Sequence, residues 1–330
     1  ILVLAFQRGL FECLCGHRMP LFRRPWRATA RSGSGDGVAT QHDECDAPAS
    51  APLRDSHATG VPYGQIDLNY LLNNLKVSPA GMVGISERAL PAVEHMLLGR
   101  FYMHRTVYFH KTTFGLEQAC AQLLRRLNLR HENGGDPHNM PKDGNSIEEL
   151  VQSEDLSEFT DAYIDQIIHH ACHDENTVVA ALAQTIASRQ PPKLLKEVNA
   201  IQTIQNPQAV DIALFQNNCR NKLRTLAEDH AIPLEHFLFC KTNPLRLEKR
   251  GHLVSGEGLQ DMASDDKEIT RVFRDDQEEP ISVVDIKHSL LYERGNFTFH
   301  TLRLYVVYNE SDAVEKVEKL RNAVKDWDKS

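Results

Sequence analysis

Hydrophobic residues recur at helical spacing through the middle of the chain, from about residue 68 to residue 229. Three or four residues separate successive apolar positions, which is the period of a helix with one buried face. Asn206-Pro207 supplies an N-cap followed by proline at the first helical position, so it predicts the start of a helix. After a short loop from Leu53, helices are predicted near residues 68–75, from about 86 to 130, and near 147–152, 158–171, 174–188, 192–200 and 206–229.

The pattern changes after residue 232, where short apolar runs replace the helical period. Runs of this length between turn residues are typical of strands. Gly295-Asn296 fits a hairpin turn, and Ser311 is expected to cap a final helix. Strands are predicted at residues 237–240, 281–286, 289–293 and 297–308. The final helix carries Val314, Val317, Leu320, Val324 and Trp327 on one face. The sequence therefore predicts a mostly α protein with a small α+β C-terminal region.

Residues 1–52 lack the apolar period and form a low-complexity leader. The first 35 residues contain six arginines and a single acid, Glu12, a bias shared by organelle transit peptides and by translated non-coding sequence. A segment of this composition is expected to be disordered. A helical domain is then expected at residues 53–230, followed by an α+β subdomain at residues 231–330.

Composition narrows the classes of function. The net charge of -8 disfavours a general nucleic-acid binder. The seven cysteines include no C-x-x-C pair, which fits a reducing, cytoplasmic compartment better than a disulfide framework. No apolar run approaches the roughly 18 residues that span a bilayer, so no membrane association is expected.

The long helix predicted from residue 86 carries the candidate chemistry. Leu90, Val93 and Leu97 share one face, at about 100° per residue. The next occupants of that face are Arg100, His104, Tyr108 and Lys111. Partly buried cations need a compensating anion, and a polyanionic ligand would supply one. The alternative is that the helix emerges into solvent after Leu97 and that these side chains are simply solvated.

Two segments resemble the HD-domain phosphohydrolases, a family of metal-dependent enzymes that includes dNTP triphosphohydrolases. The first runs from Arg54 to Gly64 and continues with Ile66-Asp67-Leu68; the second is Arg100-Phe-Tyr-Met-His104-Arg-Thr-Val-Tyr108-Phe-His110-Lys111. The resemblance implies a helical bundle of the HD-domain type, covers residues 53–197 well, and becomes looser toward the C-terminus.

The resemblance also implies roles for particular residues. Asp55 matches the aspartate that accepts a hydrogen bond from the deoxyribose 3′-hydroxyl, and Tyr108 matches the tyrosine packed under the sugar. Arg100 and Lys111 match cations near the triphosphate. His104 and His110 match positions that line the same pocket. His110, however, lies outside the helix face that carries Arg100, His104, Tyr108 and Lys111, and it has an equally good interpretation as a packing residue.

The divalent metal of this family is held by a histidine, a His-Asp pair and a later aspartate. The later aspartate should stand eight residues before Asp55, where this chain has Ala47. His42-Asp43 lies too close to Asp55 and in a segment without a helical pattern. His169, His170 and His173-Asp174 have a spacing that can bind metal, but a structural, His-rich helix end is favoured there. No metal ligand or catalytic residue is therefore assigned.

Two functions remain open. The chain is either part of a dNTP triphosphohydrolase, which in the intact family releases a deoxynucleoside and triphosphate, or a non-catalytic nucleotide-binding or oligomerisation module. In both cases a dNTP or a related nucleotide and further copies of the chain are the expected partners.

Overall fold

The computed structural model describes residues 50–135, 138, 140–141, 161–202, 210–247, 270–275, 279–292, 297–308 and 313–329. Residues 1–49 of the leader, the helix predicted at 147–152, Asn206-Pro207, Gly295-Asn296 and Ser311 lie outside the described residues. Within the described ranges, no helix is long and apolar enough to cross a membrane.

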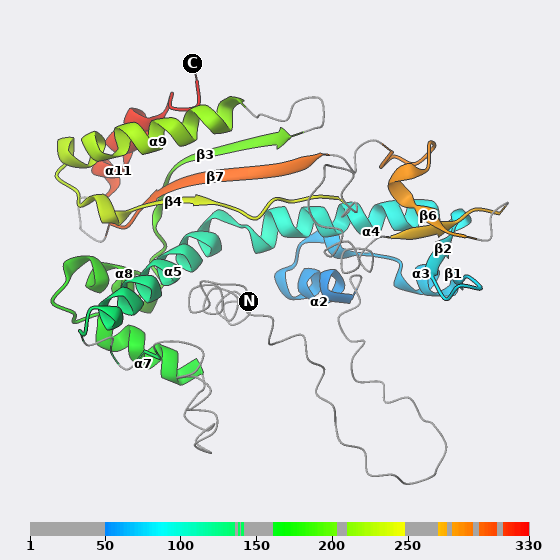
Figure 1. Ribbon diagram of the computed structural model, residues 1–330, viewed down its shortest axis with the longest axis horizontal. Coiled ribbons are helices and arrows are strands. Elements are labelled where there is room, and N and C mark those ends of the chain that lie inside the picture. Colours follow the sequence, from blue (N-terminus) through cyan, green and yellow to red (C-terminus); the bar gives the residue numbers. More distant parts are fainter. Residues whose placement is uncertain are drawn as a thin grey trace, which may run out of the picture.

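A long helical rod runs through the molecule beneath the main sheet (Figure 1). It consists of α4 (Leu90–Met103), the π-helix η4 (His104–Tyr108) and α5 (Lys111–Glu132). The predicted apolar face of α4 is buried, with Val93 0% and Leu97 2% exposed. The helix predicted from residue 86 is thus confirmed in outline, but it is interrupted near residue 110.

Two further helices pack against α5. They are α7 (Asp161–Ala171) and α8 (Thr177–Ala187), and α8 begins at Asn176, whose side chain accepts hydrogen bonds from the N–H groups of Val178 and Val179. The fully buried leucine and isoleucine side chains of this core include Leu123, Leu124, Leu127, Ile167 and Leu182. Their helical spacing is what made these elements predictable from the sequence.

The main sheet has three antiparallel strands in the order β3 (Lys193–Gln202), β7 (Thr298–Val306), β4 (Phe237–Lys241). Leu302 and Leu304 of β7 pack on one face with α9 (Val210–Asp229) and α11 (Ala313–Val324). Tyr305 points to the other face and joins the core around α5 and α8. The sheet therefore lies between two helical layers, with α9 and α11 above it and the rod below it in Figure 1.

The helix predicted at residues 192–200 is wrong, because this segment is strand β3. A register shift between Leu194 and Lys196 interrupts its pairing with β7. The shift places Leu195 and Val198 in one core although they are three residues apart, and three is also a helical spacing. Pairing with a strand about a hundred residues away decides the structure here, and a local pattern does not contain that information.

A second sheet shows that strands are not confined to the C-terminal region. Its order is β1 (Leu75–Val77), β2 (Val83–Ser86), β5 (Arg271–Phe273), β6 (Ile281–Ser282), and the sequence predicts none of the first three strands. The strand predicted at 281–286 ends early, because residues 283–285 form a 3-10 helix, and residues 289–292 are turns rather than a strand. The mostly α prediction is correct only in its broad outline.

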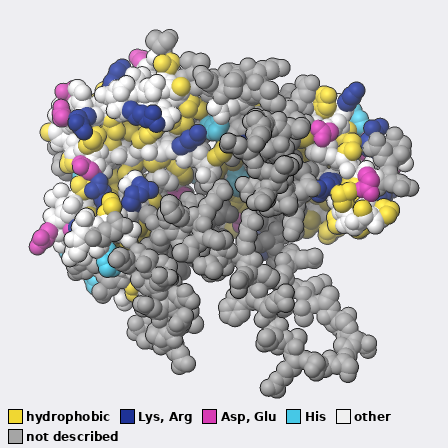
Figure 2. All heavy atoms as spheres, viewed as in Figure 1, with side chains coloured by type: hydrophobic (Ala, Val, Ile, Leu, Met, Phe, Trp, Pro, Cys, Tyr) yellow, Lys and Arg dark blue, Asp and Glu magenta, His cyan; other side chains and the backbone are white. Residues whose placement is uncertain are grey.

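Exposed apolar side chains gather on β1, β2 and the preceding α3 (Leu68–Asn73). Figure 2 shows hydrophobic side chains at the lower right, where Figure 1 places these elements. The exposed residues are Tyr70, Leu72, Leu75, Val77 and Val83. At the other end of the molecule, α11 buries Val317, Leu320 and Val324 as its pattern indicates, and Trp327 just after it is also buried, whereas Val314 is 79% exposed.

Candidate functional site

A short helix and a 3-10 turn are packed tightly against α4 at the start of the described chain. They are α2 (Ser50–Thr59) and η2 (Pro62–Gly64), and the sequence had indicated a loop where α2 lies. A Cβ atom on Gly64 would lie 2.2 Å from the carbonyl oxygen of Pro52, and one on Gly99 would lie 2.5 Å from the carbonyl oxygen of Tyr63. Only glycine allows these backbones to approach so closely, so both positions hold α2 against the rod.

The central contact of the site joins the two segments that resembled the HD-domain family. The hydroxyl group of Tyr108, the last residue of η4, donates a hydrogen bond to Oδ2 of Asp55 in α2, 53 residues earlier. Burial, followed by this hydrogen bond, raises the pKa of Tyr108 above its ordinary value. The hydroxyl therefore stays protonated near neutral pH and remains a hydrogen-bond donor.

His104 and Arg100 precede Tyr108 on the rod. The imidazole ring of His104 meets the ring of Tyr108 edge to face, with 4.8 Å between their centres. Arg100 is half-buried, and its Nη2 donates to the carbonyl oxygen of Leu247 at 3.2 Å. The structure therefore brings Asp55, His104 and Tyr108 together, while Arg100 ties α4 to the segment after β4.

His110 and Lys111 do not continue the stripe of Arg100, His104 and Tyr108. The five residues of η4 turn more widely than an α-helix, and His110 follows with extended ψ (133°), so a wheel at 100° per residue fails beyond Tyr108. His110 caps α5, its Nδ1 accepting from the N–H of Thr112 at 3.4 Å. Lys111 instead lines a cavity of about 320 Å³ whose other charged side chains are Lys193, Lys196, Glu197 and Arg321.

Two β7 side chains that the sequence did not single out also reach this break in the rod. Arg303 Nη1 donates to the carbonyl oxygen of Phe109 at 2.7 Å, and the hydroxyl of Tyr305 donates to the carbonyl oxygen of Lys111 at 2.9 Å. No local pattern could have revealed them, because 194 residues separate the partners of each bond. Strand alternation would have placed both side chains on one face of β7.

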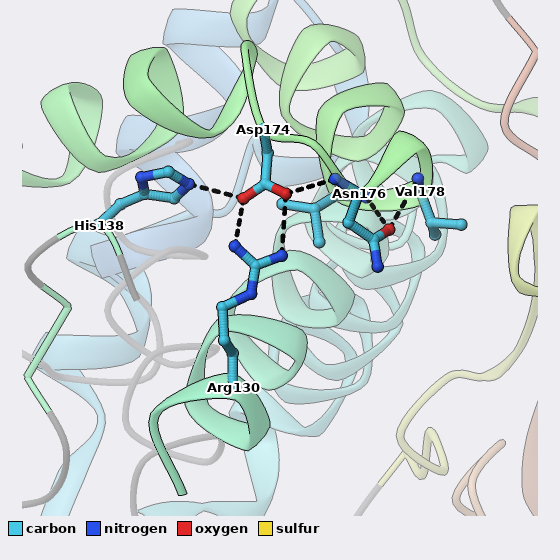
Figure 3. A network of polar contacts seen from close by, with 6 residues as sticks. Arg130, His138, Asp174, Asn176 and Val178 are labelled. Carbon is cyan, nitrogen blue, oxygen red and sulfur yellow. Dashed lines mark hydrogen bonds and ion pairs between the residues drawn. The ribbon is translucent and has the colours of Figure 1, made fainter. Parts of the chain in front are cut away.

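The His-Asp pair at His173-Asp174 has a structural role. Figure 3 shows the carboxylate of Asp174 between Arg130, at the end of α5, and His138. Arg130 donates to both carboxylate oxygens, His138 Nε2 lies 2.7 Å from Oδ2, and the N–H of Asn176 lies 2.7 Å from Oδ1. The hydrogen bonds from Arg130, foremost, hold the pKa of Asp174 well below its ordinary value. This carboxylate therefore joins three segments of the helical layer.

The described residues do not fit a metal centre. They contain no group of three or more His, Cys, Asp or Glu side chains that could hold a metal ion. His42-Asp43, and Ala47 at the position where the family has an aspartate, lie outside the described residues.

A family model described as the HD associated region matches residues 66–239, more than half of the chain. The chain belongs to this family. The match extends from the segment after η2 through the rod and α9 to β4, and so includes Arg100, His104, Tyr108, His110 and Lys111.

Two curated proteins are similar to parts of this chain. Uncharacterized protein YwfO of Bacillus subtilis is 33% identical over 81 residues, 24% of this chain and 18% of YwfO. Uncharacterized protein MJ1154 of Methanocaldococcus jannaschii is 36% identical over 63 residues, 18% of this chain and 14% of MJ1154.

Solved structures show the same fold. A phosphohydrolase (BT4208) from Bacteroides thetaiotaomicron superposes with a TM-score of 0.53 at 16% identity, covering 78% of this chain and 60% of that protein. A hypothetical protein from Aquifex aeolicus superposes with a TM-score of 0.52 at 17% identity, covering 82% and 56% respectively. The chain thus spans somewhat more than half the length of these structures and under a fifth of the two curated relatives.

Proposed function

We propose that this chain forms the sugar-binding side of a nucleotide pocket in an HD-type phosphohydrolase, and that its ligand is a dNTP. In the intact family such an enzyme converts a dNTP to a deoxynucleoside and triphosphate. The observation that carries the proposal is the hydrogen bond from Tyr108 to Asp55. Two motifs that are distant in the sequence, each matched to the sugar by resemblance, meet in the fold.

The chemistry of this pair suits a deoxyribose. The second oxygen of Asp55, Oδ1, has no hydrogen-bond partner within the described part of the chain and can accept from a 3′-hydroxyl group. The half-buried Tyr108 presents an aromatic surface on which a sugar can pack, and a ring against the sugar leaves little room for a 2′-hydroxyl. Arg100, about two turns earlier on the rod, is a half-buried cation that a phosphate could approach.

The hydrolytic step of the family requires a divalent metal, and the described residues do not fit one. No catalytic step is therefore assigned to this chain. What its own residues can do is bind and orient the sugar, through the hydrogen-bond acceptor of Asp55 and the ring of Tyr108. We expect dNTP binding without appreciable release of triphosphate in the presence of Mg²⁺ or Mn²⁺.

Thermal unfolding of the purified chain in a titration of dATP and of ATP tests the proposal. At about 100 times its dissociation constant, dATP should stabilise the fold by roughly 2.7 kcal/mol, and ATP should stabilise it less. Tyr108→Ala should reduce the difference between dATP and ATP. Tyr102→Ala is the matched control, because Tyr102 lies on the same rod but stacks on Tyr63, with 5.3 Å between the ring centres.

Triphosphate release is the outcome that separates the two functions that the sequence left open. Binding of dATP without release is the expected result and agrees with both of them, whereas release at a rate near that of an intact relative would show that the chain itself is an enzyme. Equal stabilisation by dATP and ATP, unchanged in Tyr108→Ala, would overturn the sugar site in either case.

A further inference from the structure

Side chains of the main sheet donate hydrogen bonds to the backbone at the break between η4 and α5. Carbonyl groups at the C-terminal end of a helix lack intrahelical partners and need other donors. The carbonyl group of Phe109, the C-cap residue of η4, accepts a hydrogen bond from Arg303, and the carbonyl group of Lys111, the first residue of α5, accepts one from Tyr305. Both donors lie on β7, and both carbonyls lie within three residues of Tyr108.

The guanidinium group of Arg303 is itself held in one place. Its side chain is 7% exposed, its Nε lies 2.6 Å from Oε2 of Glu197, and its charge lies 5.4 Å above the ring of Phe114. Glu197 also accepts from Asn199 at 3.0 Å. Burial opposes ionisation of Glu197, but the hydrogen bonds from Asn199 and Arg303 and the nearby positive charges hold its pKa below the ordinary value. A buried, charge-assisted pair of this kind fixes the donor geometry strongly.

The anchored residue also touches the candidate site. The ring of Phe109 lies 5.9 Å from the ring of His104 and 6.3 Å from that of Phe114, centre to centre. A rotation of the Phe109 peptide would therefore turn the last residues of η4, and Tyr108 with them. The hydrogen bond from Tyr108 to Asp55 depends on this orientation, because Asp55 belongs to a separate helix.

We propose that Arg303 is a positioning residue for the candidate site. From β7 it fixes the carbonyl group of Phe109, the residue after Tyr108, so that the hydroxyl group of Tyr108 reaches Asp55, and Tyr305 fixes the first carbonyl group of α5 in the same way. π-Helices are rare and are frequent at functional sites, which agrees with a segment that needs an external support. The effect on Tyr108 stands on geometry alone, whereas its consequence for a nucleotide rests on the proposed function.

Arg303→Met is the variant that tests this role, because it keeps an unbranched side chain and deletes the polar contacts with Glu197 and with the carbonyl group of Phe109. The readout is the pH titration of Tyr108 by NMR on tyrosine labelled at the ζ carbon, with the resonance assigned by its loss in Tyr108→Phe. In the unaltered protein Tyr108 should titrate well above the ordinary tyrosine pKa, and in Arg303→Met its pKa should fall toward that value. Affinity for dATP should fall roughly tenfold, the equivalent of one hydrogen bond.

Arg321→Met is the matched control. Arg321 also donates from Nε to a backbone carbonyl, that of Leu194, at 3.0 Å and also pairs with a carboxylate, that of Glu318, but neither group touches the rod's break. Arg303→Lys should restore part of the Tyr108 shift, because an ammonium group can still donate to Phe109. A general loss of packing would not show this selectivity or this rescue.

An unchanged Tyr108 titration in folded Arg303→Met would overturn the proposal. If that variant does not fold, Tyr305→Phe and Glu197→Gln carry the same test, and an unchanged Tyr108 titration in both would overturn it equally. Should the unaltered chain bind no dATP, the proposed function fails while the titration still decides the role of Arg303.

Discussion

Replacing Asp174 with asparagine should destabilise the helical layer. The loss should be larger than that caused by the corresponding change at the adjacent carboxylate, Glu175. The side chain of Asp174 is 2% exposed and receives hydrogen bonds from Arg130, His138 and the N–H of Asn176. Asparagine keeps the shape but removes the charge, and it turns an N–H donor toward a cation that offers only donors.

The size of the loss follows from the burial of the two partners. Removing one partner of a buried ion pair costs about 3–5 kcal/mol. Arg130 is 27% exposed, so water can solvate part of the abandoned charge, and we expect the lower end of the range. About 3 kcal/mol corresponds to a fall of roughly 6–12 °C in melting temperature for a domain of this size class.

The effect should depend on pH with a definite sign. The hydrogen bonds from Arg130 lower the pKa of Asp174 in the folded state, so its contribution is complete above the unfolded value of about 3.9. It is lost as the pH falls from that value toward the folded-state pKa. The stability difference between the unaltered protein and Asp174→Asn should therefore be full at neutral pH and shrink below about pH 4.

Urea unfolding at pH 7 and at successively lower pH measures this difference. Glu175→Gln is the control, because Glu175 is the adjacent carboxylate and is exposed. A loss below about 1 kcal/mol at pH 7, the typical value of a surface pair, or an equal loss in Glu175→Gln, would refute the reasoning.

Three further predictions concern packing, acid stability and assembly. Gly99→Ala should lower the free energy of unfolding by about 1–3 kcal/mol through overpacking, because the added Cβ would lie 2.5 Å from the carbonyl oxygen of Tyr63. An unchanged midpoint of urea denaturation would contradict the packing of η2 on α4. Burial, foremost, lowers the pKa of His236 and of His300, so the free energy of unfolding should decline as the pH falls below about 6.5. Replacing both histidines with glutamine should make this free energy, measured by urea unfolding, less dependent on pH in that range. An unaltered pH dependence would contradict the prediction. Homo-oligomer assembly stays a prediction, and sedimentation as a monomer across the micromolar range would contradict it.

Periodicity was sufficient for the elements that bury one face locally. The α4, α5, α7, α8 and α9 helices and strands β4 and β7 were all indicated by the spacing of their apolar residues. It was not sufficient for β1, β2, β3 and β5, whose structure depends on partners elsewhere in the chain. Nor could it reveal the π-helix, since a wheel drawn at a constant angle carries Lys111 onto the same face as Tyr108.

The candidate site was predictable only to the extent that its parts lie in motifs. Resemblance indicated Asp55 and Tyr108 separately, and the fold joins them by a hydrogen bond. Arg303 and Tyr305 carry no local signal, because their partners at Phe109 and Lys111 are 194 residues away. Long-range contacts of this kind depend on the strand order, and the strand order follows from the whole chain.

The central claim is that Asp55 and Tyr108 receive a deoxyribose, and calorimetric titration with dATP and its 3′-deoxy analogue tests it most directly. Asp55 should accept from the 3′-hydroxyl, so the unaltered chain should prefer dATP by roughly tenfold, the equivalent of one hydrogen bond. In Asp55→Asn that preference should shrink, while affinity for the 3′-deoxy analogue should change little. Equal affinity of the unaltered chain for both nucleotides, or a preference that survives in Asp55→Asn, would contradict the account.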